Sequence, residues 1–351
     1  MDNLEMLIKG TPDWHNIVNN NFNMVKSSVE NLDMGQASAT VVVAPYNSTN
    51  KDKADYVVPQ GAVNAQETIK SALYSLPDSG GRIILLEGTY IVNGEIFESD
   101  GNITIEGMGA STIIKANTTF TGNAIFTNGN NDTNNVIIKN LVIDCSKVAD
   151  GIDIYKSINS SIENVKILNP LGTGLALNLC SNIKIINNIF LSDGSLDNRA
   201  FDLTGNPNHE LVISNNVISG FETGMYISQT SNSIISNNII ANNFIEGINL
   251  SYSVVDNIIT QNIFNKNGYE DSGSDTCHIK LTGGNYNLIQ NNMFRKGKTG
   301  TVGVDTMVGI RIGSSCTGNM LTNNDMYDAS LGYKIIDNGT GTVTTSGNRG
   351  V

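Results

Sequence analysis

A four-residue pattern of small, apolar, variable and apolar residues occurs seven times between residues 151 and 312. It occurs at Gly151–Ile154, Gly174–Leu177, Ala200–Leu203, Gly224–Ile227, Gly247–Leu250, His278–Leu281 and Gly309–Ile312. Apolar residues at every second position indicate a strand with one buried face and one exposed face. The sequence therefore predicts one such strand at the same place in each of seven repeats.

Pairs of asparagines recur in phase with these strands. They are Asn187-Asn188, Asn215-Asn216, Asn237-Asn238, Asn291-Asn292 and Asn323-Asn324. Single Asn140, Asn164 and Asn262 take the corresponding slots of other repeats, and we align each of them with the second asparagine of a pair. Asparagine tolerates the left-handed conformation of a tight turn, and its side-chain amide can bond to the amide of the next coil. Apolar segments such as Ile183–Ile186 and Ile189-Phe190 flank each Asn turn. Three strands in each repeat predict a parallel β-helix stabilised by an Asn ladder.

The beginning of the chain has a different pattern. Thr11 and Pro12 mark a helix start, and Val18, Phe22 and Val25 begin a short heptad seam. Two heptads do not form a stable coiled coil alone. Residues 1–36 are therefore predicted to be a helical docking or oligomerisation segment, the alternative being an amphipathic helix packed on its own domain.

Residues 37–100 are predicted to lead into the coils, and residues 101–351 to form the β-helix. Thr40–Ala44 has the pattern of a first strand. Residues 64–76 have the pattern of an amphipathic helix, with Asn64 and Glu67 as a capping box and Pro77 after its end. Because the terminal repeat of a solenoid exposes apolar surface, we expect this helix to cap the first coil.

Composition excludes several classes of function. The 351 residues carry a net charge of −12, which argues against a nucleic-acid-binding surface. The sequence contains no run of 18 apolar residues, so it predicts no membrane-spanning segment. Met1–Leu4 does not have the pattern that begins a secretory signal peptide. Cys145, Cys180, Cys277 and Cys316 lack metal-binding spacing, so we expect buried thiols and neither a metal nor another cofactor.

After the predicted capping helix come Ser79-Gly80-Gly81, the apolar strand Arg82–Leu86 and the turn Glu87-Gly88-Thr89-Tyr90. This succession resembles the right-handed β-helix proteins of the pectate lyase superfamily over roughly residues 40–340. Residues Gly10–His15, followed by Asn19–Phe22, resemble the openings of tail proteins in phages and phage-tail-like particles. The two resemblances imply a tailspike-like receptor-binding protein on a virion tail or phage-tail-like particle. They also imply synthesis in the host cytoplasm, a homotrimer, docking to tail or baseplate proteins through residues 1–36, and a bacterial surface polysaccharide as ligand.

A groove is predicted along the outward side of the small-residue strands. The three longest repeats place their extra residues at one phase, between residues 192 and 199, 266 and 276, and 295 and 307, so these loops form walls on one face. Candidate glycan-binding residues on or beside the groove floor are Tyr155, Tyr226, Asn249, His278, Lys280 and Arg311. The alternatives are a solvated sheet face without a ligand and, for His278, a structural role in the core.

Two pairs of carboxylates fit the geometry of glycoside hydrolysis. Asp153 and Asp202 occupy equivalent positions two coils apart, about 9.6 Å, which approaches the separation in inverting enzymes. Glu222 and Glu246 precede the strands of adjacent coils, about 4.8 Å apart, which approaches the separation in retaining enzymes.

Three functions remain open at this point. The first is recognition of the glycan along the groove. The second is its depolymerisation, where hydrolysis is favoured over elimination because the chain lacks the arginine-containing catalytic motif of pectate lyases. A lyase would use Lys280 and Arg311 to hold a substrate carboxylate, and only then would a calcium ion be expected. The third is a purely structural tail or baseplate component.

Overall fold

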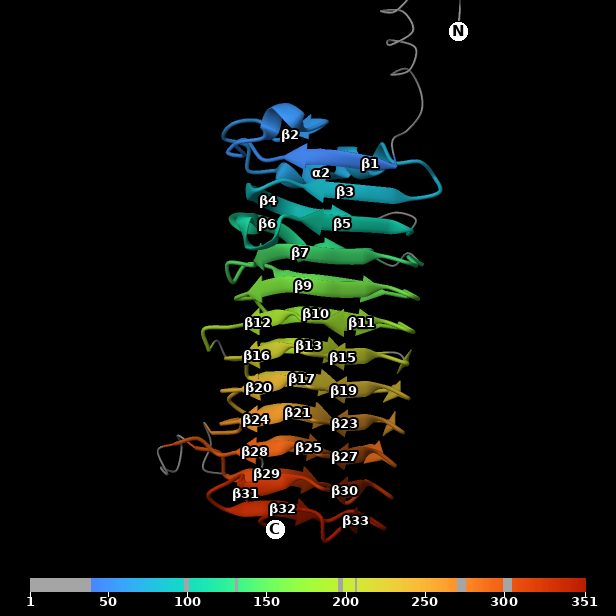
Figure 1. Ribbon diagram of the computed structural model, residues 1–351, viewed down its shortest axis with the longest axis vertical. Coiled ribbons are helices and arrows are strands. Elements are labelled where there is room, and N and C mark those ends of the chain that lie inside the picture. The colour runs from blue at the N-terminus through green and yellow to red at the C-terminus, as the bar shows by residue number, and fades with distance from the viewer. Residues whose placement is uncertain are drawn as a thin grey trace, which may run out of the picture. The chain divides into compact units, whose positions relative to one another are not determined.

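The computed structural model describes residues 39–351, except 98–100, 130–131, 195–197, 206, 270–275 and 299–304. The segment 1–36 lies outside the described residues, so its docking and oligomerisation roles remain predictions. The described part is a stack of coils whose strands run side by side from β1 (Thr40–Ala44) to β33 (Val343–Thr344), as Figure 1 shows.

Each typical coil contributes three short strands, and equivalent strands of successive coils form three columns. The first column holds the small-residue pattern: β8 (Asp150–Tyr155), β10 (Thr173–Asn178), β13 (Arg199–Leu203), β17 (Thr223–Ile227), β21 (Glu246–Leu250), β25 (Cys277–Leu281), β29 (Val308–Ile312) and β32 (Tyr333–Asp337). The second column contains β11 (Lys184–Ile186), β15 (Val212–Ser214), β19 (Ile234–Ser236), β23 (Ile258–Thr260), β27 (Leu288–Gln290), β30 (Met320–Thr322) and β33. The third column contains β12 (Ile189–Leu191), β16 (Val217–Ser219), β20 (Ile239–Ala241), β24 (Ile263–Asn265), β28 (Met293–Arg295) and β31 (Asp325–Asp328).

In the earlier coils some of these strands run together. The second column begins with β1, β3 (Gly81–Leu85) and β5 (Ile103–Gly107), and β2 (Tyr56–Val57) pairs with β1. Strands β7 (Ile137–Asp144) and β9 (Ser161–Leu168) each span the second and third columns, and β4 (Gly88–Phe97) and β6 (Thr112–Thr127) span the third and first. The polar turn after the first strand forms a small sheet of its own: β14 (Asn208–His209), β18 (Thr230–Ser231), β22 (Val254–Val255) and β26 (Gly284–Asn285).

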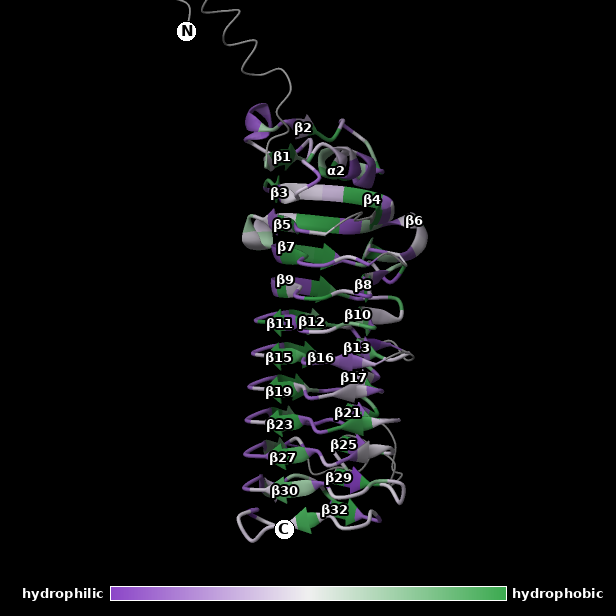
Figure 2. Ribbon diagram, turned by 90° about the vertical axis from the view of Figure 1, so that its right-hand side faces the viewer, coloured by the Kyte–Doolittle hydropathy of each residue, from purple (hydrophilic) through white to green (hydrophobic). Residues whose placement is uncertain are grey.

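Every pairing between these described strands is parallel, from β1–β3 to β30–β33. This arrangement confirms the predicted right-handed parallel β-helix with three strands per coil. In Figure 2 the strands of the second column are coloured as hydrophobic and the turns beside them as hydrophilic. The alternation along each strand thus places one set of side chains inside the stack and the other outside.

The interior is a column of stacked apolar side chains. Ile213, Ile235 and Ile259 follow one another in register and are at most 3% exposed. Phe264 stacks on Phe294 of the next coil with ring centroids 4.8 Å apart. Each such side chain, fully buried, contributes about 1.5–3 kcal/mol. All four cysteines are buried, as predicted, and none forms a disulfide.

The predicted Asn ladder runs through Asn188, Asn216, Asn238, Asn262, Asn292, Asn324 and Asn348. Asn238 shows the repeating contact. Its backbone N–H and side-chain Nδ2 both donate to Oδ1 of Asn262, at 2.9 Å each, and Nδ2 also donates to the Ile213 carbonyl at 3.0 Å. Each asparagine of the ladder therefore provides hydrogen-bond partners for buried backbone groups that, because of the turn, take no part in strand pairing.

The two asparagines of a pair have different tasks. The first, as at Asn237 with φ 56°, takes the left-handed conformation, and the second is buried in the ladder. Asn140 and Asn164 also have positive φ, and the Val165 N–H donates to Oδ1 of Asn188. They are thus equivalent to the first asparagine, so aligning them with the second was wrong by one residue.

The first and last coils of the described stack differ from the coils between them. Helix α2 (Ala65–Tyr74) buries Ile69, Ala72 and Leu73 in the core, as expected for a cap on the first coils. The capping-box prediction was wrong, because the Asn64 side chain makes no cap hydrogen bond. The last coil is polar, and Asn348 continues the ladder. None of the helices in the described ranges has the length and apolar character to cross a membrane.

Replacing Asn238 by Ala should lower the free energy of unfolding by about 2–4 kcal/mol, because it leaves buried amides of Asn216 without an acceptor. The matched control is Asn237→Gly, which keeps the left-handed turn and removes only an exposed side chain. The midpoint of chemical denaturation measures both variants. Equal midpoints would contradict the importance of the ladder.

Candidate functional site

The outward side of the first column carries a continuous row of varied side chains. Strand pairing places Asp153, Ala176, Asp202, Tyr226, Asn249, Lys280 and Arg311 at one register position in successive coils. The row runs from carboxylates through an aromatic ring and an amide to two cations. The register confirms that the predicted floor residues, apart from His278, belong to one face.

A cleft of about 200 Å³ opens at the acidic end of this row. It is lined by three aspartates, by polar residues of β6 and β10, and by the residue after β13: Asp150, Asp153, Asp202, Asn123, Thr173, Asn178 and Thr204. Asp153 and Asp202 therefore face the same space, as the sequence predicted. With two coil steps between them, their backbones are about 9.6 Å apart, near the separation of inverting glycosidases.

Asp153 is the carboxyl group most suited to hold a proton. No described residue forms a hydrogen bond or ion pair with it. Burial raises its pKa above the usual 3.8, and the negative charges of Asp150, Glu95 and Asp202 raise it further. A carboxyl group in this environment retains its proton at higher pH and can act as a general acid.

Asp202 is held by a cation. Its Oδ2 accepts a 2.6 Å hydrogen bond from Arg199, whose guanidinium lies 4.1 Å from the centre of the Tyr226 ring. Its Oδ1 is buried and has no hydrogen-bond partner among the described residues. One oxygen is therefore fixed, and the other is an available acceptor in the cleft.

Asp150 belongs to the same cleft and was missed from the sequence. Its Oδ1 accepts hydrogen bonds from the backbone of Gly172 at 2.8 Å and Thr173 at 2.9 Å. Burial raises its pKa despite these bonds. Asp150 directly precedes Gly151, as Glu246 precedes Gly247, so the reasoning that selected Glu246 would also have found it.

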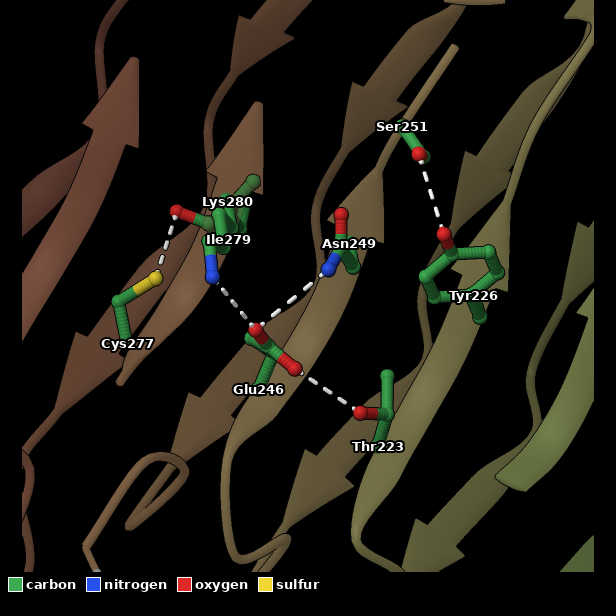
Figure 3. A network of polar contacts seen from close by, with 8 residues as sticks. All are labelled: Thr223, Tyr226, Glu246, Asn249, Ser251, Cys277, Ile279 and Lys280. Carbon is green, nitrogen blue, oxygen red and sulfur yellow. Dashed lines mark hydrogen bonds and ion pairs between the residues drawn. The ribbon is translucent and has the colours of Figure 1, made fainter. Parts of the chain in front are cut away.

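Glu246 lies at the centre of a polar network further along the row (Figure 3). Its carboxylate is almost fully buried and accepts hydrogen bonds from Thr223 at 2.9 Å, Asn249 at 3.4 Å and Lys280 at 3.2 Å. Tyr226 lies beside this network, and its hydroxyl contacts Ser251 at 3.1 Å. Lys280 balances the charge of Glu246, so the pair forms a neutral part of the groove floor.

The prediction that a single coil step separates Glu222 from Glu246 was wrong by one residue. Strand pairing places Glu246 opposite Thr223, and Glu222 precedes β17 by one residue. The one-residue offset takes Glu222 out of the register position of Glu246. A catalytic role of Glu222 and Glu246 therefore stays a prediction.

The prediction that His278 binds glycan was also wrong, and the structural alternative holds. The ring is fully buried, and its two nitrogens contact Asn267 Nδ2 at 3.1 Å and the Ala329 carbonyl at 3.0 Å. Burial lowers its pKa to about 3. His278 takes the slot of the small ladder residues, where a side chain on Gly174 would lie 3.0 Å from Phe190. That slot faces the core, not the groove.

Tyr155 and Arg311 complete the predicted set. Tyr155 is partly exposed two residues beyond Asp153, and Arg311 is partly exposed beside Lys280. Asn249 contributes a buried Oδ1 that has no partner in the described ranges. Rings, amides and cations of this kind suit a ligand rich in hydroxyl groups. In the part of the chain that is described, no group of three acidic, His or Cys side chains is arranged to hold a metal ion.

Two family models match this sequence. The model for the right handed beta helix region matches residues 203–349. The model for rhamnogalacturonase A/epimerase, pectate lyase-like, matches residues 55–249, more than half of the chain. No curated protein matches the sequence.

Solved structures share the fold at low sequence identity. A protein of Geobacillus virus E2 has a TM-score of 0.61 at 14% identity, covering 98% of this chain and 64% of its own. The Dettilon tailspike protein has a TM-score of 0.54 at 17% identity, covering 88% of this chain and 66% of its own. The catalytic domain of an α-1,3-glucanase in complex with nigerose has a TM-score of 0.52 at 15% identity, and the match covers 84% of this chain and 68% of that domain's chain. This chain thus spans about two thirds of the length of each of these three proteins.

Asp153→Asn should stabilise the protein at neutral pH. Because the folded-state pKa of Asp153 is raised, the folded protein binds this proton more tightly than the unfolded chain does. The charged carboxylate therefore costs stability above the folded pKa, and this cost disappears as pH falls below 3.8. Melting temperatures should show a gain at pH 7 that vanishes near pH 3. A gain of equal size at both pH values would contradict the assignment.

Proposed function

Because the chain belongs to the rhamnogalacturonase A/epimerase, pectate lyase-like family, and because its first column holds paired carboxylates in a cleft, we propose that it binds a polysaccharide along this groove and hydrolyses it. The observation that carries the proposal is the contrast between two aspartates of one row. Asp153 has a raised pKa and no partner in the described residues, and Asp202 is held by Arg199 with one oxygen left as an acceptor. Two carboxyl groups in different environments are what acid–base hydrolysis requires.

The reaction follows from these roles. Asp153 donates its proton to the glycosidic oxygen as the bond from that oxygen to the anomeric carbon breaks. Asp202 accepts a proton from a water molecule, whose oxygen bonds to the anomeric carbon from the opposite face. The products are two shorter chains, one with a new reducing end of inverted configuration. Because Asp153 must be protonated, the rate should fall as pH rises through its pKa.

The rest of the row binds and orients the polymer. The Tyr226 ring, with Arg199 on it, offers a face for a sugar ring, and Asn249 and Arg311 offer hydrogen-bonding groups. Tyr155 extends this surface beyond Asp153. Lys280 is paired with Glu246, so a substrate carboxylate would have to compete with that ion pair. This pairing favours hydrolysis over elimination.

The polymer is a bacterial surface polysaccharide in this proposal, and the protein acts on the tail of a phage or phage-tail-like particle. The resemblance of Gly10–His15 to tail-protein openings and the fold shared with a tailspike protein support this setting. Residues 1–36 would attach it to tail or baseplate proteins as a homotrimer. The second candidate function is recognition without cleavage, favoured by the engagement of Asp202 with Arg199.

Asp153→Asn and Asp202→Asn should each reduce polysaccharide cleavage at least about a hundredfold and leave binding nearly unchanged, because general acid–base roles contribute on that order. Tyr226→Ala should weaken binding by roughly five- to tenfold through lost ring contacts. The assay follows new reducing ends and the absorbance of unsaturated uronates on capsular or wall polysaccharides of candidate hosts.

Glu163→Gln is the matched control, since Glu163 lies outside the cleft in the second column. It should cleave like the parent. New reducing ends without the absorbance indicate hydrolysis, and both signals together would replace it with elimination. Binding by the parent without either signal would leave recognition as the function. Unchanged cleavage and binding in all three groove variants would place the site elsewhere.

A further inference from the structure

The row that carries the two candidate catalytic aspartates contains one short side chain. Ala176 pairs with Asp153 on one side and with Asp202 on the other, so it lies midway between the two carboxyl groups. Of the seven residues in this row, it is the one whose side chain ends at the β-carbon. The others are two carboxylates, an aromatic ring, an amide and two cations. The row therefore has a gap at the place of the proposed reaction.

Packing of the core does not require this small residue. Leu175 and Leu177, on either side of Ala176 in the same strand, are 0% and 1% exposed, whereas Ala176 is partly exposed and lines the cleft. The aspartates in the adjacent coils show that the scaffold accepts a longer side chain at this position. Alanine is also depleted in strands. What distinguishes Ala176 is thus the space that it leaves above the strand.

This space has the dimensions that hydrolysis with inversion requires. It belongs to the cleft of about 200 Å³, and the backbones of Asp153 and Asp202 lie about 9.6 Å apart on either side of it. Inverting enzymes need such a separation because a water molecule has to fit between one carboxylate and the sugar. A longer side chain at Ala176 would project between the two carboxyl groups. It would fill the space that the sugar ring and the water would occupy.

The charges around the cleft favour a sugar without a carboxylate. Three aspartates line the cleft, and its lining within the described residues includes neither Lys nor Arg. Arg199 is already paired with Asp202. Lys280 and Arg311 lie three and four coil steps beyond Asp202, about 14 and 19 Å away. These distances exceed the screening length of about 8 Å at physiological ionic strength, so neither cation offsets the repulsion between a substrate carboxylate and the aspartates.

We propose that Ala176 is a specificity-determining residue, which admits a single uncharged sugar unit to the cleft between Asp153 and Asp202. That unit supplies the anomeric carbon of the bond that is cut, so the short side chain sets the coil at which cleavage occurs. The restriction applies to this unit and not to the rest of the polymer. The inference rests on the proposed function for its chemistry, but occupancy of the cleft by a glycan can be tested without cleavage.

A change in the size of this side chain tests the proposal. Ala176→Leu should reduce the kcat of polysaccharide cleavage at least about a hundredfold, because a displaced sugar ring no longer lies between the two carboxyl groups. Binding should change less than about threefold, since Tyr226 and the rest of the row still contact the polymer. Ala176→Ser, which adds one atom, should keep most of the activity.

Ala241→Leu is the matched control for size. Ala241 is partly exposed on an outward row of β20, outside the cleft, so this variant should fold and cleave like the parent. Melting temperatures check the folding of both leucine variants. An Ala176→Leu variant that cleaves like the parent would overturn the proposal.

The products of the parent identify the sugar at the cleft. Mass spectrometry of the fragments should find an uncharged sugar at every new reducing end, even when the polysaccharide also contains uronates. A uronate at the new reducing end would overturn the proposal.

A labelling experiment tests occupancy of the cleft without cleavage. Because all four native cysteines are buried, Ala176→Cys introduces a thiol in the cleft that iodoacetamide can modify selectively. A saturating concentration of the host polysaccharide that the parent binds should slow this modification at least about tenfold, since bound sugar would cover the thiol. Ala241→Cys should react at one rate with and without the polysaccharide.

The labelling result separates this proposal from the proposed hydrolysis. Equal rates for the Ala176→Cys variant with and without the polysaccharide would overturn the present proposal even if the parent cleaves the polymer. Protection of the thiol without new reducing ends from the parent would count only against the proposed hydrolysis. A parent that binds no host polysaccharide would overturn both.

Discussion

The structure depends on how a buried turn satisfies its backbone amides. At each Asn turn the chain leaves one column and enters the next, so the strand ladder cannot supply the acceptor. The side chain of the second asparagine supplies it from the adjacent coil, as Asn262 does for Asn238 at 2.9 Å. An unpaired buried amide costs about 1–3 kcal/mol, so a coil that shifts by one residue loses a rung as well as its buried side chains. The ladder therefore fixes the register of every coil on the next.

Because the register is fixed, the side chains at one outward position of successive coils form a straight row. Different rows can carry different kinds of side chain. The first column combines Asp153, Asp202 and Tyr226 on one such row. One outward row of the third column carries Lys166 in an earlier coil and Ile239 in a later one. One scaffold thus presents a polar groove on one column and a row of different character on another. Because the core and the ladder carry the stability, neither surface has to contribute to folding.

The sequence predicted what repeats and failed where a residue breaks the repeat. Periodicity alone identified the columns, the ladder and the row containing Asp153 and Asp202, because in a stack of similar coils the same position in every repeat lies in one line along the stack. Period does not reveal which residue of a turn faces inward, and Asn164 was therefore misaligned by one position. The one-residue offset between Glu222 and Glu246 has the same origin. His278 could be placed only by packing, since its two hydrogen bonds come from segments remote in sequence.

The acidic cleft shows what the rigid scaffold makes possible. Asp150 and Asp153 both have raised pKa values because burial and neighbouring carboxylates disfavour their charged forms. Among the described residues, the ion pair of Arg199 is with Asp202 and not with either of these two aspartates. On a flexible surface, a cluster of carboxylates like this one would separate, because exposure to water lowers the free energy of each charged group. Here the strands that carry the aspartates are held in register by rungs and core on both sides. The repulsion therefore appears as a raised pKa of Asp153 instead of local unfolding, and the proposed hydrolysis depends on this raised pKa.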